Sequence, residues 1–517
     1  NPILGLNQID AIAIADTQDT IKPCINLEKD MEAIPEAEHL SKNINSEFSD
    51  LCPVISPDGK TLYFTRDKHP ENIGTDKNED IWYAKAVDND FEKAKNLGPP
   101  INNKWNNFAF SISPDGNALL LGNAYYPNDS IGQGVSISYF KGDNWSFPKK
   151  LEIQNYYNLH KKYVGFFLAG SGKVLLSTLE RDDSQGGMDL YASFLQNDGT
   201  WSEPLNLGTS INTAADEATP FLAADDVSLY FSTAGRCGYG SNDMFVSRRL
   251  DSTWTKWSEP VNLGPKLNTP GWDAYYTIPA SGEYAYFVST TNSYGQEDIF
   301  RVKLPESLRP KPVVLISGRV LNANNEPVDA KIVYETLPSG MEAGIARSNP
   351  KTGEYKIALP AGAKYGFLAE AQGFIAINEN LDLQNIKNYQ EITRDLHLVP
   401  IEQGQTIRIN NIFFEFGKYE LLEDSYSELN RIVSFLKDNP NVSIQINGHT
   451  DNIGPAQRNL TLSKKRAEAV SEYLISKGII NSRLKIKGFG QTKPIEKNNT
   501  EEGRSRNRRV EFVILNK

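Results

Sequence analysis

The sequence predicts a multidomain protein that begins with a five-bladed β-propeller, continues with a small β-sandwich and ends with an α/β domain. Three observations lead to this fold class. A short motif recurs about every 56 residues in the first three hundred residues. Strand patterns broken by turn residues fill residues 313–400, and residues 401–517 alternate between strand and helix periodicity. The length of 517 residues allows about three to five domains.

The composition is that of folded domains rich in β-structure. Apolar residues make up 39% and charged residues 23%, and 23 Tyr and 23 Phe stand beside 38 Gly and 28 Pro. The net charge of −11 is uneven: residues 401–517 hold 19 basic and 14 acidic residues (+5), so the remainder carries −16. An acidic body argues against nucleic acid as the partner. No apolar run approaches the roughly 20 residues that span a bilayer as a helix.

The recurring motif begins with Ser56-Pro57-Asp58-Gly59 and continues into an apolar strand. It returns at residues 113–121 and, in weaker form, near 169–176, 224–231 and 280–287. The glycines at 59, 116, 172 and 282 are 57, 56 and 110 residues apart, which indicates five units. Four short strands per unit, with Gly, Pro and Asp turns and no helical periodicity, are typical of a propeller blade.

A second element ends the units. Residues 96–102 read Asn-Leu-Gly-Pro-Pro-Ile-Asn, and related sequences stand at 206–212 and 262–268. The fifth unit lacks this ending, but a similar piece, residues 40–45, precedes the first unit. We therefore expect the N-terminal segment to supply the outer strand of the last sheet and to close a propeller over residues 38–305. Residues 1–37 then form an N-terminal extension.

These repeats resemble the WD-like β-propellers of TolB-type periplasmic proteins. An Asp recurs at the second strand expected in four of the units, at Asp80, Asp189, Asp243 and Asp298. One Asp per unit beside a turn indicates a cap for backbone amides rather than a metal ligand. The three cysteines, Cys24, Cys52 and Cys237, form no CxxC motif. A Cys24–Cys52 bridge stays open, and buried free thiols are the favoured interpretation.

Residues 305–312 hold three prolines and indicate a stiff linker. Beyond it, residues 313–400 alternate between strands and turns, as in a small β-sandwich. The pattern, including Thr352-Gly353-Glu354-Tyr355 and Leu359-Pro360-Ala361-Gly362, resembles the carboxypeptidase regulatory-like domain. Despite its name that module has no peptidase site, so the resemblance implies a spacer.

Residues 401–517 predict a compact domain of order βαβαββ. Strands are expected at 407–416, 442–446, 483–488 and 509–515, with one helix between Glu420 and Pro440. Ser463 looks like the N-cap of a second helix that runs through Ser476, with Gly478 past its end.

Four motifs in this domain resemble the OmpA-like peptidoglycan-binding domain. They are Phe413–Phe416, Gly448–Gly454, Asn459–Ala467 and Gly503–Phe512, and they stand in the family's order. The resemblance implies that Asp451 and Arg466 clasp diaminopimelate of the peptidoglycan stem peptide. Asn459, Thr450 and Phe416 are implied as further residues of the pocket. Gly417 stands where the family commonly has an acidic residue, which affects the lip of the pocket rather than the clasp.

The chemistry of such a clasp agrees with these residue types. Diaminopimelate ends in an ammonium beside a carboxylate, and a host needs an anion and a bidentate cation held apart on rigid elements. An Arg in the first turn of a helix opposes the helix dipole, which hints at a role other than stability. The alternative is that Asp451 caps its loop and Arg466 pairs with Glu502 or Asp451. For the cluster Arg504–Arg509, a solvated face with internal ion pairs is favoured over contact with glycan.

No enzyme is indicated. The five His are scattered, and no HExxH, GxSxG or GxxxxGK[ST] motif is present. We expect no catalytic residue, metal site or cofactor.

The domain order resembles propeller–regulatory-like–OmpA-like envelope proteins of Bacteroidetes, some of which are accessory parts of type IX secretion systems. It implies a non-catalytic periplasmic protein, associated with the outer membrane and peptidoglycan, whose propeller presents a scaffold to envelope protein partners. Two alternatives stay open: a propeller-based enzyme or glycan-binding lectin tethered to the cell wall, and a purely structural linker between outer membrane and peptidoglycan.

Overall fold

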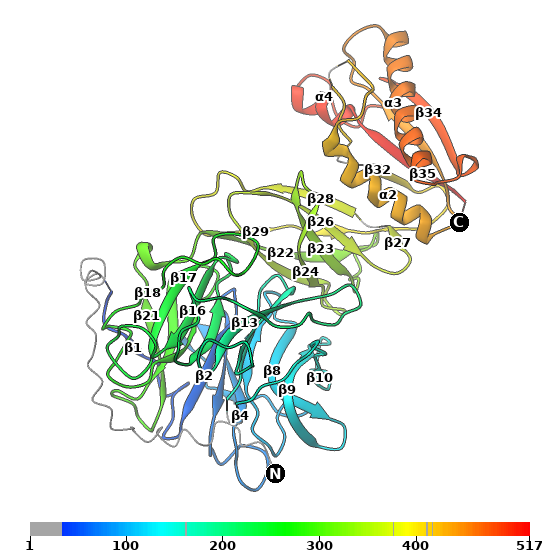
Figure 1. Ribbon diagram of the computed structural model, residues 1–517. Helices are drawn as coiled ribbons and strands as arrows, with labels where there is room; N and C mark the ends of the chain where they lie inside the picture. The colour runs from blue at the N-terminus through cyan, green and yellow to red at the C-terminus, as the bar shows by residue number, and fades with distance from the viewer. Residues whose placement is uncertain (1–33, 161–162, 376, 410–411, 416, 517) are drawn as a thin grey trace. The chain divides into compact units, whose positions relative to one another are not determined.

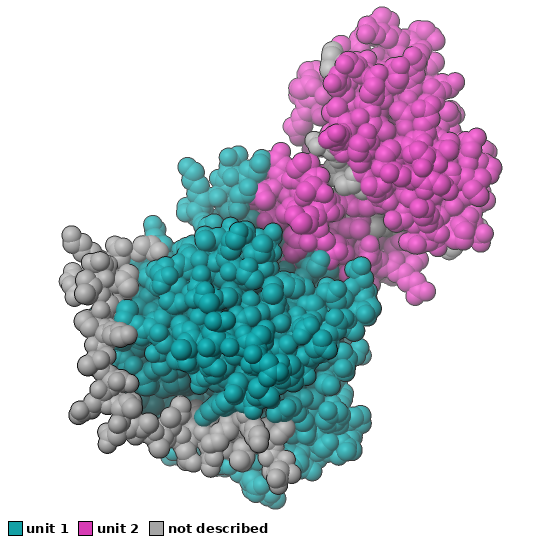
Figure 2. Space-filling model, in the orientation of Figure 1, with its two compact units in different colours: residues 1–318, 344–362, 384–394 teal, residues 319–343, 363–383, 395–517 magenta. Residues whose placement is uncertain are grey.

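The computed structural model describes residues 34–160, 163–375, 377–409, 412–415 and 417–516. Figure 2 colours its two compact units. The first comprises the chain up to Gly318 together with residues 344–362 and 384–394, and the second comprises residues 319–343, 363–383 and 395–517. Strands dominate, and the α-helices of the described residues all lie between Tyr426 and Asn507 (Figure 1).

Five small antiparallel sheets make up most of the first unit, one for each sequence repeat. The first has the order β2-β3-β4-β5, with β6 also on β4: Asp50–Ile55, Thr61–Arg66, Asp80–Val87, Asp90–Phe91 and Lys95–Asn96. The second, β7 to β10, has Ala109–Ile112, Ala118–Tyr126, Ser130–Tyr139 and Lys149–Lys150. The third, β11 to β14, has Gly165–Leu168, Val174–Leu179, Asp189–Phe194 and Leu205–Asn206. The fourth, β15 to β18, has Glu217–Leu222, Ser228–Thr233, Asp243–Arg248 and Val261–Asn262.

The fifth sheet joins both ends of the repeat region. Its order is β1-β21-β20-β19, with β1 Glu38–His39, β19 Ala274–Thr277, β20 Tyr284–Ser289 and β21 Asp298–Lys303. The expected pairing of the N-terminal segment with the last repeat is therefore present. Glu38 lies opposite Arg301 and His39 lies opposite Phe300. The first strands of successive sheets are also neighbours: β2 contacts β7, β7 contacts β11, β11 contacts β15, β15 contacts β19, and β19 contacts β2.

The last Asn of the repeated ending explains why that ending recurs. Asn102 accepts the N–H of Ile81 through Oδ1 (3.0 Å) and donates through Nδ2 to the carbonyl of the same residue (2.8 Å), as a neighbouring strand would. Asn212 makes the same two bonds to Leu190, and Asn268 makes them to Met244. These bonds give the N–H of each strand residue a partner. They also give its carbonyl a second donor, beside the backbone N–H of Leu97, Leu207 or Leu263.

The recurring Asp residues cap turns, as the sequence predicted. Asp80 accepts the backbone N–H of Ile73 at 2.8 Å, and Asp189 accepts that of Gln185 at 2.7 Å. The same carboxylate oxygens accept a side-chain N–H from Asn96 and Asn206 respectively. The equivalent bonds of Asp243 go to Tyr239 and Asn262.

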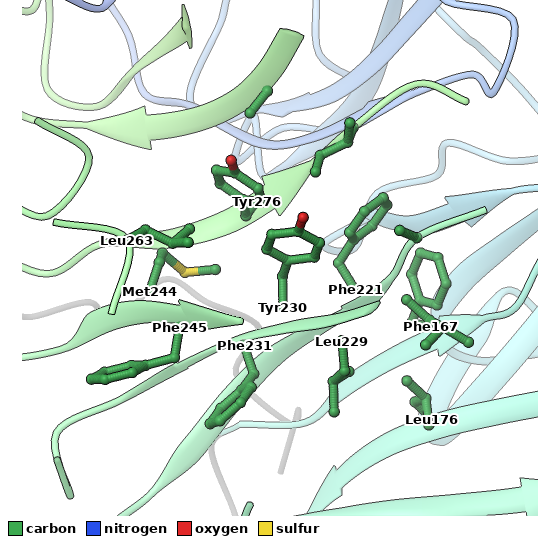
Figure 3. Close-up of a cluster of buried hydrophobic side chains, with 14 of the residues drawn as sticks. Phe167, Leu176, Phe221, Leu229, Tyr230, Phe231, Met244, Phe245, Leu263 and Tyr276 are labelled. Carbon is green, nitrogen blue, oxygen red and sulfur yellow. The ribbon is translucent and has the colours of Figure 1, made fainter. Parts of the chain in front are cut away.

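A cluster of buried aromatic and aliphatic side chains spans the third, fourth and fifth sheets. Figure 3 shows Tyr230 of β16 and Tyr276 of β19 side by side within it, with ring centroids 5.0 Å apart and planes inclined by 26°. Phe167 and Phe221 meet edge to face at 5.1 Å. Offset and edge-to-face rings of this kind add stability beyond the area that they bury.

The Ser-Pro-Asp-Gly turns and their weaker copies contact residues 344–362, which belong to the first unit. Gly59 has φ +70°, a conformation that favours glycine, which explains its recurrence in the motif. Asp58 of this turn forms an ion pair with Lys356, and the carbonyl of Ser171, in the third copy, accepts the N–H of Ile345 at 2.9 Å. Residues 305–312, which were expected to form a stiff linker, contact the fourth copy of the motif: Lys311 donates its N–H to Asp225 at 2.8 Å.

The expected sandwich region contains two larger sheets and a small one. One has the order β25-β22-β29, with β30 also on β22: β22 is Val313–Leu321, β25 Glu354–Pro360, β29 Gln390–Thr393 and β30 Leu396–His397. The other has the order β24-β23-β26-β28: Met341–Arg347, Lys331–Leu337, Lys364–Glu370 and Ile377–Asp382. The small sheet pairs β27 Phe374–Ile375 with β31 Val399–Pro400, and a 3₁₀ turn, η1, spans Glu306–Leu308.

The C-terminal domain has four strands in the order β32-β35-β33-β34, with β33 and β34 parallel. In chain order its elements are β32 Thr406–Ile409, η2 Glu423–Ser425, α2 Tyr426–Asp438, β33 Ser443–His449, α3 Ala456–Ser476, η3 Asn481–Arg483, β34 Leu484–Gly490, α4 Glu501–Asn507 and β35 Val510–Asn516. The predicted βαβαββ order was wrong by one helix, because α4 lies between the last two strands.

The start of α3 also differs from the prediction. The helix begins at Ala456, directly after Gly454-Pro455, and Ser463 lies inside it. Ser463 Oγ donates to the carbonyl of Leu460 and accepts the N–H of Gly490, so it joins the helix to β34 instead of capping it. Arg466 consequently lies well beyond the first turn, and the argument from the helix dipole does not apply. Among the described residues, no helix is long and apolar enough to cross a membrane.

Candidate ligand-binding site of the C-terminal domain

Close packing of α3 against β33 positions the predicted site. A Cβ at Gly448 would lie 2.0 Å from the carbonyl oxygen of Ser463, so only glycine lets the helix approach this closely. Asp451 follows the end of β33 by two residues, and Arg466 lies on α3 one turn beyond Ser463. The two predicted residues therefore stand on a strand end and a helix that are rigidly packed together.

Asp451 is buried, and both of its carboxylate oxygens have partners. Oδ1 accepts the backbone N–H of Ile453 at 2.9 Å, which confirms that Asp451 caps its own loop. Oδ2 accepts from Nη1 of Arg508 at 2.8 Å. The side chain of Asp451 is 8% exposed and that of Arg508 is 29% exposed, so the ion pair lies at the rim of the domain.

Arg466 is buried but only partly paired. Its Nε donates to the carbonyl of Lys418 at 3.0 Å, and its guanidinium lies over the ring of Phe414, 4.8 Å from the centroid. Among the described residues, its two terminal nitrogens have no hydrogen-bond partner, and no ion pair joins Arg466 to Asp451 or Glu502. Burial, and then the charge of Arg508, lower the pKa of Arg466, while Asp451 opposes the shift. The three charged groups are thus close enough to influence one another.

Asn459 and Thr450 stabilise the loop that carries Asp451. Asn459 Nδ2 lies within hydrogen-bond distance of the carbonyls of Asp451 (3.3 Å) and Ile453 (3.2 Å) and of Gln491 Oε1 (2.8 Å). Thr450 Oγ1 donates to the carbonyl of Asp451 at 2.9 Å. Their observed contacts fix the backbone around the carboxylate. Phe416, the fifth predicted residue, lies outside the described residues.

Sequence reasoning missed Arg508 as a partner of Asp451. It treated the cluster Arg504–Arg509 as one solvated face with internal ion pairs. Such pairs are present, between Arg504 and Glu501 and between Arg506 and Glu502, for example. Arg508 differs because α4 directs it to the end of β33, 57 residues earlier in the chain. Its second guanidinium nitrogen donates to Glu501 at 2.7 Å.

Comparisons with known proteins match the C-terminal domain of this chain. The model of the OmpA family matches residues 413–508, a range that includes Asp451, Arg466 and Arg508. The peptidoglycan-associated lipoprotein of Buchnera aphidicola subsp. Baizongia pistaciae (strain Bp) is 34% identical over 134 residues, which are 26% of this chain and 75% of the lipoprotein. The chain belongs to the OmpA family.

Other relatives match the same part of the chain. The peptidoglycan-binding protein ArfA of Mycobacterium tuberculosis (strain ATCC 25618 / H37Rv) is 42% identical over 94 residues, or 18% of this chain and 29% of ArfA. A crystal structure of the peptidoglycan-associated lipoprotein from Burkholderia pseudomallei is 30% identical, covers 20% of this chain and 89% of that chain, and has a TM-score of 0.20. The chain spans about a third of the length of several curated relatives, ArfA among them.

Behind the site, the OmpA-family domain holds a second buried charge cluster. Nε2 of His449 lies 3.3 Å from Oε2 of Glu511, and its ring stacks on Phe489 at 5.2 Å. Arg509 donates to the other oxygen of Glu511 at 2.6 Å. Burial works in the opposite direction, but these two neighbours lower the pKa of Glu511 to about 2. The carboxylate thus stays charged at neutral pH and braces the end of β33 next to the OmpA-family site.

Outside the OmpA-family domain, the favoured interpretation of buried free thiols is confirmed for Cys52 and wrong for Cys237. Cys52 is a buried free thiol and Cys237 is disulfide-bonded, so a Cys24–Cys52 bridge is excluded. The described residues contain no group of three or more His, Cys, Asp or Glu side chains placed to hold a metal ion.

Proposed function

We propose that the protein binds peptidoglycan through its OmpA-family domain, with Asp451 and Arg466 receiving the free end of diaminopimelate. One observation carries the proposal. Arg466 is 7% exposed, yet its terminal nitrogens have no partner among the described residues. A largely buried guanidinium whose terminal nitrogens have no protein partner favours an anionic ligand, and a carboxylate offers it two parallel hydrogen bonds. The names of ArfA, a peptidoglycan-binding protein, and of the peptidoglycan-associated lipoproteins support peptidoglycan as the ligand.

The contacts suggest a division of roles. Phe414 and the Lys418 carbonyl fix the plane of the Arg466 guanidinium, which leaves its terminal edge for a carboxylate. Asp451 supplies the negative charge for the ammonium of the same ligand end. Asn459 and Thr450 hold the Asp451 loop in place, and we keep Phe416 as a proposed member of the pocket.

Sedimentation of the full chain with purified sacculi tests this function. Asp451→Ala and Arg466→Ala should each weaken binding about five- to a hundredfold, the equivalent of roughly 1–3 kcal/mol. Arg466→Lys should also bind more weakly, because an ammonium cannot reproduce the bidentate fork. Arg506→Ala, on the exposed side of α4, is the matched control and should leave binding unchanged. Folded alanine variants that bind sacculi as tightly as the parent would refute the assignment.

For the N-terminal region we propose a five-bladed propeller over residues 38–305, closed by β1 and followed by a regulatory-like sandwich over 313–400. The cycle of neighbours among the first strands and the pairing of β1 with β21 support closure. The propeller then serves as a non-catalytic scaffold for envelope proteins, including components of a type IX secretion system. Cross-linking in intact cells, followed by identification of the captured proteins, tests this role.

We further propose that the protein works in the periplasm, associated with the outer membrane and peptidoglycan. The disulfide at Cys237 supports an oxidising compartment, because thiols of cytosolic proteins are kept reduced. Fractionation of the source cells, with the redox state of Cys237 determined in each fraction, checks the location.

A further inference from the structure

The two halves of the candidate site are in different states. The anion-binding half is open, since the terminal nitrogens of Arg466 have no hydrogen-bond partner among the described residues. The cation-binding half is occupied: Asp451 Oδ1 holds the N–H of Ile453, and Oδ2 holds Nη1 of Arg508. An incoming ammonium therefore meets a carboxylate that already has a cationic partner from its own chain.

We propose that Arg508 is an internal competitor for the ammonium position, which a ligand must displace from Asp451 in order to bind. This inference rests on the proposed function and adds a specificity-determining residue to the same site. An ammonium bound to Oδ2 would lie next to the Arg508 guanidinium, and like charges at such close range repel. Both cations cannot use the small exposed part of this carboxylate equally well.

Three features identify Arg508 as the partner that moves. Its side chain is 29% exposed, whereas Asp451 at 8% is held by the Ile453 N–H and has little room. Arg508 keeps a second partner when it leaves, because its Nη2 donates to Glu501 at 2.7 Å. Its neighbour Arg466 is also a cation, and their mutual repulsion contributes to the lowered pKa of Arg466. Displacement therefore relieves one unfavourable contact and leaves no charge unpaired.

The ligand binds only those molecules in which Asp451 is free. Its apparent affinity is therefore the intrinsic affinity multiplied by the fraction of such molecules. A partly exposed ion pair contributes on the order of a three- to tenfold bias toward the closed form. The bias acts only on ligands with an ammonium, because a ligand that carries a carboxylate alone can bind Arg466 and leave Arg508 in place. Arg508 thus sets how strongly the site distinguishes an ammonium–carboxylate pair from a plain carboxylate.

Calorimetric titration of the full chain tests the competitor with two synthetic peptides. One is the stem tripeptide that ends in meso-diaminopimelate, and the other carries 2-aminopimelate, which keeps the terminal carboxylate and lacks the ammonium. Arg508→Ala should bind the diaminopimelate tripeptide about three- to tenfold more tightly than the parent and the analogue within twofold of it. Arg504→Ala is the matched control, since Arg504 shares Glu501 but does not contact Asp451. It should bind both peptides as the parent does.

A second variant predicts the opposite change. Glu501→Ala removes the alternative partner of Arg508, so Arg508 should stay on Asp451 and the tripeptide should bind about two- to fivefold more weakly. Arg508→Gln, which keeps the side-chain size, serves if the alanine variant does not fold. The proposal that Arg508 competes with the ligand is overturned if loss of Arg508 weakens binding of the tripeptide or leaves it unchanged. It is also overturned if the affinities of both peptides change equally. A parent chain that does not bind the tripeptide overturns the proposed function itself.

Discussion

Asn45 forms with Ile299 the same two backbone-like hydrogen bonds that Asn102, Asn212 and Asn268 form within their own sheets. Its Oδ1 accepts the Ile299 N–H at 2.9 Å and its Nδ2 donates to the Ile299 carbonyl at 2.9 Å, across 254 residues of sequence. The neighbouring His39 contacts Asp298 through Nε2 at 2.7 Å, where Asn96 and Asn206 serve the equivalent aspartates. The N-terminal segment thus reproduces these contacts of the repeated ending, with His39 in the place of the first Asn.

Replacing Asn45 should therefore destabilise the repeat region. Asn45→Ala leaves the buried N–H of Ile299 without a partner, while the Ile299 carbonyl keeps the N–H of Leu40. This change should lower the free energy of unfolding by about 1–3 kcal/mol. Urea unfolding followed by tryptophan fluorescence measures the change, since all seven Trp lie in the repeats. The control Asn128→Ala, on an exposed turn, should unfold like the parent. Identical transitions for both variants would show that this contact does not hold the fifth sheet together.

A buried carboxylate should make this region less stable at alkaline pH. Burial raises the pKa of Glu79 to about 8, and its Oε2 has no hydrogen-bond partner among the described residues. The folded state therefore keeps this proton while the unfolded chain releases it above its ordinary pKa of 4.5. The stability that this group contributes is complete below about pH 4.5 and is lost as the pH rises through about 8.

Glu79→Gln separates this group from the others. The variant should match the parent near pH 5 and exceed its free energy of unfolding by about 1–3 kcal/mol near pH 9, because a neutral amide avoids a buried unpaired charge. The exposed Glu92→Gln should show no such dependence in the same urea series. A difference between Glu79→Gln and the parent that is constant over this pH range would contradict the raised pKa.

The Glu511 cluster should have the opposite pH dependence. Its lowered pKa means that the carboxylate contributes stability above its ordinary pKa of 4.5, and that this contribution is lost as the pH falls through about 2. Glu511→Gln should cost about 1–3 kcal/mol at pH 7 and progressively less in acid. Hydrogen exchange of the β33 and β35 amides reports on this domain alone. Glu502→Gln, 79% exposed, is the control, and an equal loss of protection in both variants would argue against the cluster.

Gly448→Ala tests the close packing that brings α3 to the site. The new Cβ would overlap the Ser463 carbonyl, so the helix must shift, at a cost of about 3 kcal/mol. We expect lower amide protection of α3 together with weaker binding to sacculi. Gly170→Ala is the control, because the nearest atom to its Cβ lies 3.5 Å away. Full protection and full binding by Gly448→Ala would mean that the strand and helix adjust without loss.

Local patterns were sufficient to locate the repeats, the capping aspartates and the segment that pairs with β21. Each of these features is carried by a short motif that recurs from repeat to repeat, so it can be found by comparing the repeats in the sequence. The start of α3 was misplaced because Ser463 looks like a cap, although Gly454-Pro455 marks the helix start. The partner of Asp451 was missed because six neighbouring positions contain four arginines, and only the path of α4 selects Arg508 among them.

The pairing of Glu38–His39 with β21 has a consequence for the order in which the chain folds. Residue 38 leaves the ribosome, or a translocation channel, long before its partner at residue 301. The first segment must therefore wait while about 260 residues follow, and contacts of such large sequence separation form slowly. Until then β1 has no partner strand, and an unpaired strand edge is the kind that pairs with other chains. Synthesis that stops short of the fifth repeat should therefore leave an aggregation-prone fragment rather than a smaller stable protein.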